Sequence, residues 1–105
     1  MELTIIIPVY NVENHLSRCL DSIFVGNNID GEFEVIAVDD GSMDNSYGIL
    51  QEYAFRYKQL KIYHQENQGS SVARNKALDV ATGKYIMFVD SDDFVEKDSI
   101  NTILQ

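Results

Sequence analysis

Two spacings of apolar residues alternate along this chain. Short runs of β-branched and other apolar residues are typical of strands buried inside a sheet. Such runs occupy residues 3–9, 33–40, 60–65 and 84–90. The segments between the runs carry apolar residues three and four positions apart, which is the spacing of one face of a helix. These stripes contain Leu16, Cys19, Leu20, Ile23 and Phe24, then Ile49, Leu50, Tyr53 and Tyr57, and then Val72, Ala73, Ala77, Leu78 and Ala81.

The alternation of runs and stripes predicts the fold class. A fourth helix is expected to begin within residues 97–105, which completes the order β-α-β-α-β-α-β-α. Strands that alternate with helices form parallel sheets, because each helix carries the chain back to the start of the next strand. We therefore expect an α/β domain with a mostly parallel sheet of about four strands and helices on both faces.

Three local details of this fold are also predicted. Asn11 has a side chain suited to capping the first helix, and Thr82 and Gly83 are expected to end the third helix. The apolar run 84–90 is expected to be buried. Because an exposed parallel edge is prone to pair with other chains, this run needs a neighbouring strand, and self-association through that edge is one way to supply it.

The totals exclude several classes of protein. With 105 residues, of which 45% are hydrophobic, the chain fits one globular domain. No apolar run approaches the roughly 20 residues that cross a bilayer, so no membrane segment is predicted. The net charge of −9 argues against a surface that binds nucleic acid. A single cysteine is compatible with a reducing compartment, so we expect a cytoplasmic location, at the cytoplasmic face of the membrane if the protein is longer.

Polar residues directly follow every predicted strand. In a parallel sheet the carboxyl ends of the strands share one edge, where ligands of such folds bind. Residues far apart in the sequence are therefore expected to meet there. The residues concerned are Pro8, Tyr10 and Asn11 after the first strand, Asp39, Asp40, Gly41 and Ser42 after the second, Glu66, Asn67, Gln68 and Gly69 after the third, and Asp90, Ser91, Asp92 and Asp93 after the fourth.

The residue types at this edge suit a ligand that carries phosphates. The chain has neither the G-x-G-x-x-G nor the G-x-x-x-x-G-K-[ST] pattern, so a glycine-rich phosphate loop is not expected. Mg²⁺ and Mn²⁺ prefer oxygen ligands and often combine carboxylates with substrate phosphates. Asp90 and Asp92 supply a carboxylate pair, and Arg74 could add positive charge toward a phosphate. Asp40 could accept a hydrogen bond from a base, and Tyr10 could lie against its ring.

Each of these features also has a purely structural interpretation. The acidic residues 90–93 could form a solvated turn, and residues 39–42 could form a tight turn that caps a helix. Arg74 could be a surface arginine. Cys19 lies on a helical stripe and is expected in the core, and the two histidines have no partners at metal-ligand spacing.

Taken together, the motifs resemble those of the family 2 glycosyltransferases, which have the GT-A fold. The matching stretches occur in the family's order and span nearly the whole chain. They read TIIIPVYN, VIAVDDGSMDNS, ENQGSSVARNKAL and GKYIMFVDSDDF. The resemblance implies a Rossmann-like GT-A half-domain that binds a nucleotide-diphosphosugar donor of the UDP, GDP or TDP type, together with Mn²⁺ or Mg²⁺.

The resemblance also implies roles for individual residues. Those that match the nucleotide site of the family are Pro8, Val9, Tyr10, Asp39, Asp40, Arg74, Asp90 and Ser91, and those that match its metal site are Asp90 and Asp92. Asp40 is the expected contact of the base, and Asp92 is the expected metal ligand of the DxD motif.

An activity follows from the same resemblance. Family members transfer a sugar with inversion, and the acceptor here would be a glycan or a lipid-linked molecule, as in polysaccharide biosynthesis. The family's catalytic base and acceptor site lie later in the GT-A domain, and nothing in residues 1–105 matches them. We therefore expect residues 1–105 to be the donor-binding part, with the base beyond Gln105. The alternatives are a nucleotide-sugar-binding module without turnover and a sugar nucleotidyltransferase.

Overall fold

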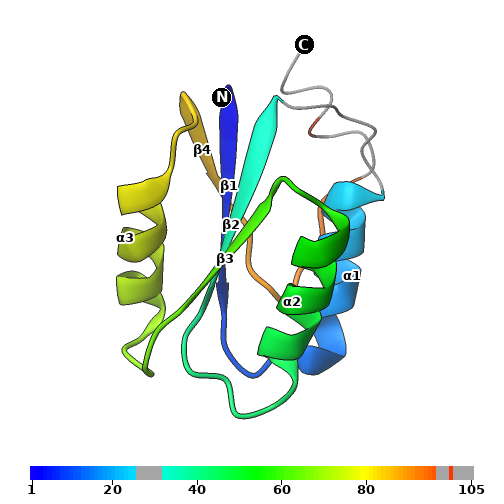
Figure 1. Ribbon diagram of the computed structural model, residues 1–105, viewed down its shortest axis with the longest axis vertical. Coiled ribbons are helices and arrows are strands. Elements are labelled where there is room, and N and C mark those ends of the chain that lie inside the picture. The colour runs from blue at the N-terminus through cyan, green and yellow to red at the C-terminus, as the bar shows by residue number, and fades with distance from the viewer. Residues whose placement is uncertain (26–31, 97–99, 101–105) are drawn as a thin grey trace.

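The computed structural model describes residues 1–25, 32–96 and 100, and it confirms the alternation of strands and helices. Figure 1 shows the sheet in the middle of the molecule with helices on either side. The elements are β1 (Leu3–Val9), α1 (Glu13–Phe24), β2 (Phe33–Asp39), α2 (Ser46–Arg56), β3 (Leu60–His64), α3 (Ser70–Val80) and β4 (Tyr85–Phe88).

All pairings in the sheet are parallel, and the strand order is β3-β2-β1-β4. Val9 at the end of β1 lies opposite Asp39 at the end of β2, and Asp39 lies opposite His64 at the end of β3. The register thus brings the carboxyl ends of these three strands to the same level. The predicted α/β fold with a parallel sheet is confirmed.

Helices cover both faces of the sheet, as predicted. α1 and α2 cover one face, and α3 covers the other (Figure 1). α3 approaches the sheet through Ala73 and Ala77, which pack against Ile6, Ile36 and Val38. Because β1 and β2 are covered on both sides, they can be apolar at nearly every position.

The predicted helical stripes are buried to different extents. Apart from Phe24, the stripe of α1 is fully buried, and burial of each large aliphatic side chain contributes roughly 1.5–3 kcal/mol. The stripe of α3 is narrower than predicted, since Val72 and Leu78 are 40% and 42% exposed. Among the described elements, α3 is alone on its face of the sheet, so its flanks stay open to solvent.

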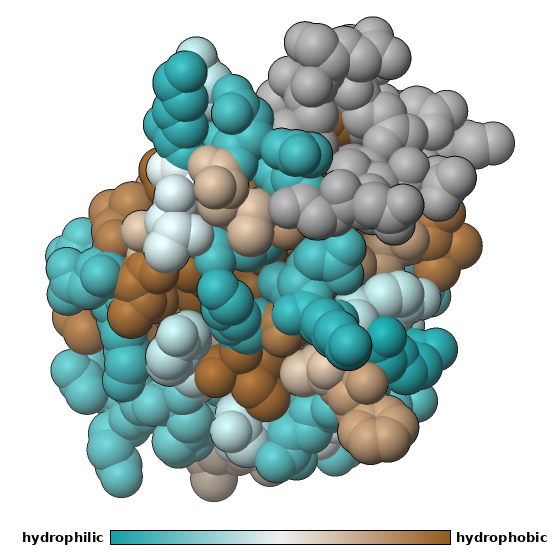
Figure 2. All heavy atoms as spheres, turned by 45° about the horizontal axis from the view of Figure 1, so that its top comes forward, coloured by the Kyte–Doolittle hydropathy of each residue, from teal (hydrophilic) through white to brown (hydrophobic). Residues whose placement is uncertain are grey.

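β4 is not the buried strand that the sequence predicts. It is shorter than the apolar run 84–90 and lies at the edge of the sheet. Tyr85, Ile86 and Phe88 are 56%, 38% and 50% exposed, and Figure 2 shows hydrophobic surface on the left of the view, where α3 and β4 lie. The prediction failed because an apolar run indicates a strand but does not show whether that strand lies in the centre or at the edge of the sheet.

The predicted cap of the first helix is also wrong. α1 begins at Glu13, its N-cap residue is Val12, and no side chain of the cap residue bonds the helix. Asn11 lies before the cap, and its Oδ1 accepts a hydrogen bond from Met43 N at 2.8 Å. A contact between two turns has replaced the local cap.

A buried carboxylate joins the strands at their amino ends. Glu34 is 1% exposed and accepts hydrogen bonds from Thr4 Oγ1 (2.7 Å), Lys61 Nζ (2.8 Å), Thr82 N (2.7 Å) and Thr82 Oγ1 (2.9 Å). Burial raises the pKa of Glu34, but these hydrogen bonds outweigh burial and lower the pKa to about 2. Gly83 N donates to Thr4 Oγ1, and a Cβ at Gly83 would collide with the backbone nitrogen of Thr4.

Two segments are largely outside the described residues. The helix expected within residues 97–105 is described only at Ile100, which is buried. Residues 26–32, whose glycine and asparagine residues favour a turn, are described only at Glu32. Within the described ranges, no helix has both the length and the apolar character needed to cross a membrane.

Candidate functional site

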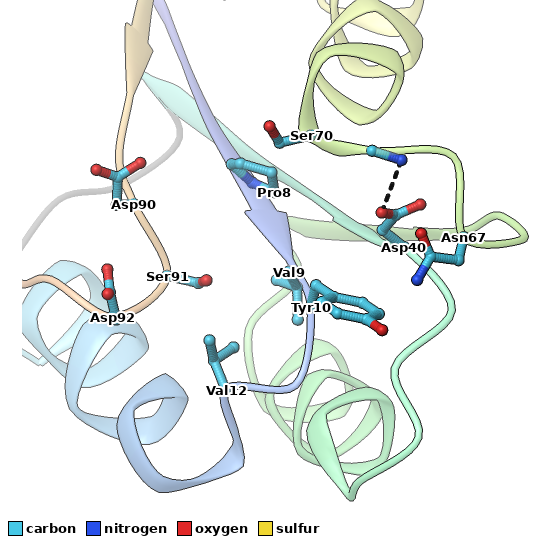
Figure 3. A pocket seen from close by; sticks show the side chains of 11 residues that line it. Pro8, Val9, Tyr10, Val12, Asp40, Asn67, Ser70, Asp90, Ser91 and Asp92 are labelled. Atoms are coloured by element: carbon cyan, nitrogen blue, oxygen red, sulfur yellow. Dashed lines mark hydrogen bonds between the residues drawn. The ribbon is translucent and has the colours of Figure 1, made fainter.

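A pocket of about 470 Å³ opens at the carboxyl edge of the sheet, where the sequence predicted that the loops would meet. In Figure 3 the end of β1 crosses the middle of this pocket, with Asp40 and Asn67 on one side and Asp90 and Asp92 on the other. The lining residues are Pro8, Val9, Tyr10, Val12, Asp40, Asn67, Gly69, Ser70, Asp90, Ser91 and Asp92. Turns that follow all four strands therefore contribute to one site.

Most of the predicted site residues come together in this pocket. Those that line it are Pro8, Val9, Tyr10, Asp40, Asp90, Ser91 and Asp92. Arg74 is not a lining residue, but its Nη2 lies 3.9 Å from Asp90 Oδ1, at the side of the acidic residues. The convergence predicted from the strand order is confirmed.

Some lining residues were not predicted as site residues. Asn67 and Gly69 belong to the loop after β3, so the sequence carried a signal for them in the convergence of the loops. Val12 and Ser70 lie where α1 and α3 begin, and their contribution depends on where each helix starts. The uncertainty of helix ends in sequence patterns explains why these two were missed.

Asp39 does not line the pocket, in contrast to the prediction. Its side chain is fully buried on the opposite face of the sheet from Asp40, because successive residues of a strand point to opposite faces. Asp39 Oδ2 lies 2.8 Å from His64 Nδ1 and accepts a hydrogen bond from Ser42 N at 3.3 Å. Its other oxygen has no hydrogen-bond partner among the described residues. This arrangement supports the turn that carries Asp40.

Asp40 is held on one side of the pocket by three donors. Gln65 Nε2 and Gln68 N donate to Oδ1 at 2.8 and 2.7 Å, and Gly69 N donates to Oδ2 at 3.0 Å, the bond dashed in Figure 3. Burial raises the pKa of Asp40, but these hydrogen bonds outweigh burial and lower the pKa below its usual value. Since a carboxylate has about four acceptor positions, Asp40 can accept one further hydrogen bond from a ligand.

Tyr10 is placed in the pocket by two interlocked turns. The turn after β1 and the loop after β2 share four hydrogen bonds. They run from Asn11 N to Ser42 Oγ (3.0 Å), from Met43 N to Asn11 Oδ1 (2.8 Å), from Val12 N to Ser46 Oγ (2.9 Å) and from Glu13 N to Asp44 Oδ2 (3.1 Å). Asn11 adopts a φ of 50°, which asparagine tolerates better than most residues. Tyr10 itself is 43% exposed, so its ring can pack against a ligand.

The opposite side of the pocket carries exposed carboxylates. Asp90 and Asp92 line it, and the side chain of Asp90 is 70% exposed. Among the described residues, no three His, Cys, Asp or Glu side chains are grouped closely enough to hold a metal ion. The two carboxylates fit Mg²⁺ or Mn²⁺ by the chemistry of their oxygens, provided that a ligand such as a diphosphate supplies further oxygens.

α1 supports the loop that carries these carboxylates. Three contacts join them, namely Cys19 Sγ to Asp90 O (3.7 Å), Val95 N to Ser22 Oγ (2.8 Å) and Arg18 Cζ to the ring of Phe94 (4.3 Å). Burial, reinforced by the negative charges of this loop, raises the pKa of Cys19 to about 12. Cys19 is therefore a protonated core thiol, as its place on the helical stripe predicts.

Known proteins resemble this chain in sequence. The family model described as glycosyl transferase family 2 matches residues 4–105. The glycosyltransferase GlyA of Streptococcus pneumoniae is 43% identical over 102 residues, which cover 97% of this chain and 14% of GlyA.

Solved structures give the same result. The crystal structure of S. aureus TarS 1–349 in complex with UDP has a TM-score of 0.90 and 34% identity, over 99% of this chain and 31% of that one. The mannosyltransferase PcManGT from Pyrobaculum calidifontis, in complex with GDP-Man and Mn²⁺, has a TM-score of 0.85 and 26% identity, over 98% of this chain and 31% of that one. The chain thus spans less than a third of the length of each of these three proteins. Because the family model covers nearly the whole sequence and the fold follows that of these GT-A enzymes, this chain belongs to glycosyl transferase family 2.

Proposed function

We propose that this chain binds the nucleotide-diphosphosugar donor of a glycosyltransferase. The observation that supports the proposal best is that Asp40 and Tyr10 line the same pocket as Asp90 and Asp92. A donor of this class has a flat base at one end and a sugar at the other, with the charged diphosphate between the ribose and the sugar. The pocket offers a ring and a fixed acceptor on one side, and carboxylates suited to a metal–diphosphate complex on the other. The UDP bound to TarS and the GDP-Man bound to PcManGT support this ligand class.

Three side chains have defined roles in this proposal. The ring of Tyr10 packs against the base, and Asp40 accepts a hydrogen bond from a base N–H. Arg74, beside Asp90, offsets part of the negative charge where the diphosphate lies. Its guanidinium can also donate to phosphate oxygens.

The metal proposed for this site is Mn²⁺ or Mg²⁺. Asp90 and Asp92 would hold it together with oxygens of the diphosphate. When bound, the ion supplies Lewis-acid stabilisation of the departing diphosphate. The Mn²⁺ in the PcManGT complex supports this choice.

For the whole protein, we propose inverting transfer of the sugar to a glycan or lipid-linked acceptor, as in polysaccharide biosynthesis at the cytoplasmic face of the membrane. Such a displacement needs a base that deprotonates the acceptor hydroxyl. The family resemblance implies a base in the later half of the GT-A domain, so its proposed place is beyond Gln105. Residues 1–105 would then bind the donor without turnover, and their exposed β4 edge would favour self-association.

Calorimetric titration tests donor binding directly. UDP, GDP and TDP are titrated into the protein in the presence and absence of Mn²⁺, and we expect at least one of them to bind. The Asp92→Asn variant should weaken binding in Mn²⁺ roughly tenfold or more. Asp93→Asn is the matched control, because Asp93 is the adjacent carboxylate and does not line the pocket.

Two outcomes would contradict this function. Donor binding is excluded if none of the three nucleotides binds, and the metal assignment is excluded if Asp92→Asn binds in Mn²⁺ as tightly as the wild type. Sugar transfer to an added acceptor by the purified chain would contradict the proposed location of the base.

A further inference from the structure

The side chain of Gln65 makes a contact that the donor site does not explain. Gln65 is 6% exposed and is not a lining residue of the pocket. Its Nε2 nevertheless donates to Asp40 Oδ1 at 2.8 Å. The other two described donors to Asp40 are backbone groups of the loop before α3, so Gln65 supplies the one side chain, within the described part of the chain, that holds this carboxylate.

The backbone fixes both partners of this contact. Gln65 N donates to Asp39 O at 2.9 Å, and Asp40 N donates to Val9 O at 2.8 Å, so both residues continue the pairing of the sheet. A buried amide attached to a fixed backbone has few other positions to occupy. Asp40 is thus held in place before a ligand arrives, which lowers the entropy lost on binding.

We propose, on the basis of the donor site described above, that Gln65 is a positioning residue for recognition of the nucleotide base. Its amide N–H keeps Asp40 as an ionised, acceptor-only group whose remaining acceptor position faces the ligand. An ionised carboxylate pairs with a ring N–H, which uracil, thymine and guanine possess. Cytosine presents a bare ring nitrogen at the same edge, so the site discriminates against it.

The titratable groups around Asp40 do not form ion pairs with it. Among the described residues, no ion pair joins Asp40 to another titratable group. His64 pairs with Asp39 on the opposite face of the sheet, and Lys76 Nζ donates to His64 O. The remaining groups near the site are Glu66 in the loop before α3, Arg74 on α3, Tyr10 beside Asp40, and Asp90 and Asp92 across the pocket. A pH effect that appears only on changing Gln65 would therefore arise at its contact with Asp40.

The Gln65→Glu variant gives this contact a pH dependence. At about pH 5 the pair of carboxyl groups retains a proton that one donates to the other, much as the amide does; at about pH 8 both are ionised and repel each other. We expect the Kd for UDP of the variant, divided by that of the wild type, to rise roughly tenfold or more between these pH values. The probe is UDP with Mg²⁺, replaced by GDP throughout if the wild type binds only GDP.

Two further variants separate positioning from a structural role. Gln68→Glu makes the same chemical change at an exposed glutamine whose backbone N–H also contacts Asp40, and its Kd ratio should not change with pH. Gln65→Met removes the donor without adding a titratable group. It should weaken UDP binding by a factor that is constant in pH and should reduce the preference for UDP over CDP roughly threefold or more.

The outcomes are distinct. If the wild type binds UDP but the Gln65→Glu ratio is flat between about pH 5 and pH 8, Gln65 does not position Asp40. If Gln65→Glu does not fold, Gln65→Met decides, and an unchanged preference for UDP over CDP overturns the inference. If the wild type binds none of UDP, GDP and TDP, the proposed function fails and this inference fails with it.

Discussion

Glu34 and Asp40 are two buried carboxylates on the same face of the sheet, one at each end of β2. Among the described residues, Glu34 accepts four hydrogen bonds, three at Oε2 and one at Oε1, and all come from protein groups at the amino ends of the strands. Asp40 accepts three, two at Oδ1 and one at Oδ2, and it lines the pocket at the carboxyl edge, so Oδ2 keeps an acceptor position for a ligand there. Both pKa values are lowered for the same reason, because hydrogen bonds outweigh burial. A lowered pKa therefore does not distinguish the two carboxylates, whereas their positions do, because Asp40 lines the pocket that also contains Tyr10, Asp90 and Asp92 and Glu34 does not.

The largest expected effect is a loss of stability on changing Glu34, near the amino end of β2. Glu34→Ala leaves Thr4 Oγ1 and Thr82 N without their acceptor, whereas the Lys61 side chain is 47% exposed and can turn to solvent. Each buried donor left unsatisfied costs roughly 1–3 kcal/mol, so the two together cost roughly 2–6 kcal/mol. We expect the free energy of unfolding in urea to fall by about that amount. Glu32→Ala is the control, because Glu32 is exposed, and its effect should stay within about 0.5 kcal/mol. A small loss for Glu34→Ala would mean that the Glu34 carboxylate does not stabilise the fold.

The contribution of Glu34 to stability should also depend on pH. The pKa of Glu34 falls from 4.5 to about 2 on folding, so its contribution is fully present above about pH 4.5 and is lost as the pH falls toward 2. By linkage, roughly 2 kcal/mol of this contribution should be gone at pH 3. The measurement is the difference in unfolding free energy between the wild type and Glu34→Gln, from pH 7 to pH 3. A difference that does not shrink would contradict the lowered pKa.

At the carboxyl end of β2, changing Asp40 is expected to weaken UDP binding. Asp40→Asn places an amide N–H against some of the three donors, so the side chain cannot serve them and the base together. UDP affinity should fall roughly tenfold or more, about 1.4 kcal/mol. Folded Glu34→Ala, by contrast, should bind UDP within about twofold of the wild type. Equal loss of binding in both variants would break the distinction between the two carboxylates.

The smallest expected effect concerns Arg74. Its side chain is 38% exposed and its Nη2 lies 3.9 Å from Asp90 Oδ1, a geometry that contributes little in water. Arg74→Gln should weaken UDP binding about threefold at low salt and less at high salt. Lys76→Gln removes one positive charge from the same helix away from Asp90, and it should have no comparable effect on calorimetric binding.

Much of the fold could be predicted because its strongest signals are local. The continuous apolar runs of β1 and β2 require cover on both faces, and the helices between them impose a parallel sheet. The exposure of β4 could not be predicted, since it depends on which strand lies at the edge. The contact of Asn11 could not be predicted either, because its side chain accepts a hydrogen bond from Met43, far along the chain, and does not cap α1.

The site was predictable to the level of residues but not of contacts. Strand order alone brings Asp40 and Asp92 to one pocket. Side chains alternate between the two faces of a strand, which explains why Asp40 lines the pocket and the neighbouring Asp39 does not. The role of Gln65 depends on the register of β3 against β2 and on a rotamer, and neither is encoded in a local pattern. The same holds for Glu34, which reads in sequence as one polar residue in an apolar strand.

Gly83 has a consequence for surveys of tolerated substitutions. It is only partly buried and lies in a loop, so it would be ranked among the permissive positions by accessibility. A side chain there meets the main chain of β1, which cannot retreat without breaking its pairing with β2. In a saturation library selected for soluble expression, every replacement of Gly83 should be depleted as severely as a charge introduced at Ile6, and this intolerance should not be mistaken for a catalytic requirement.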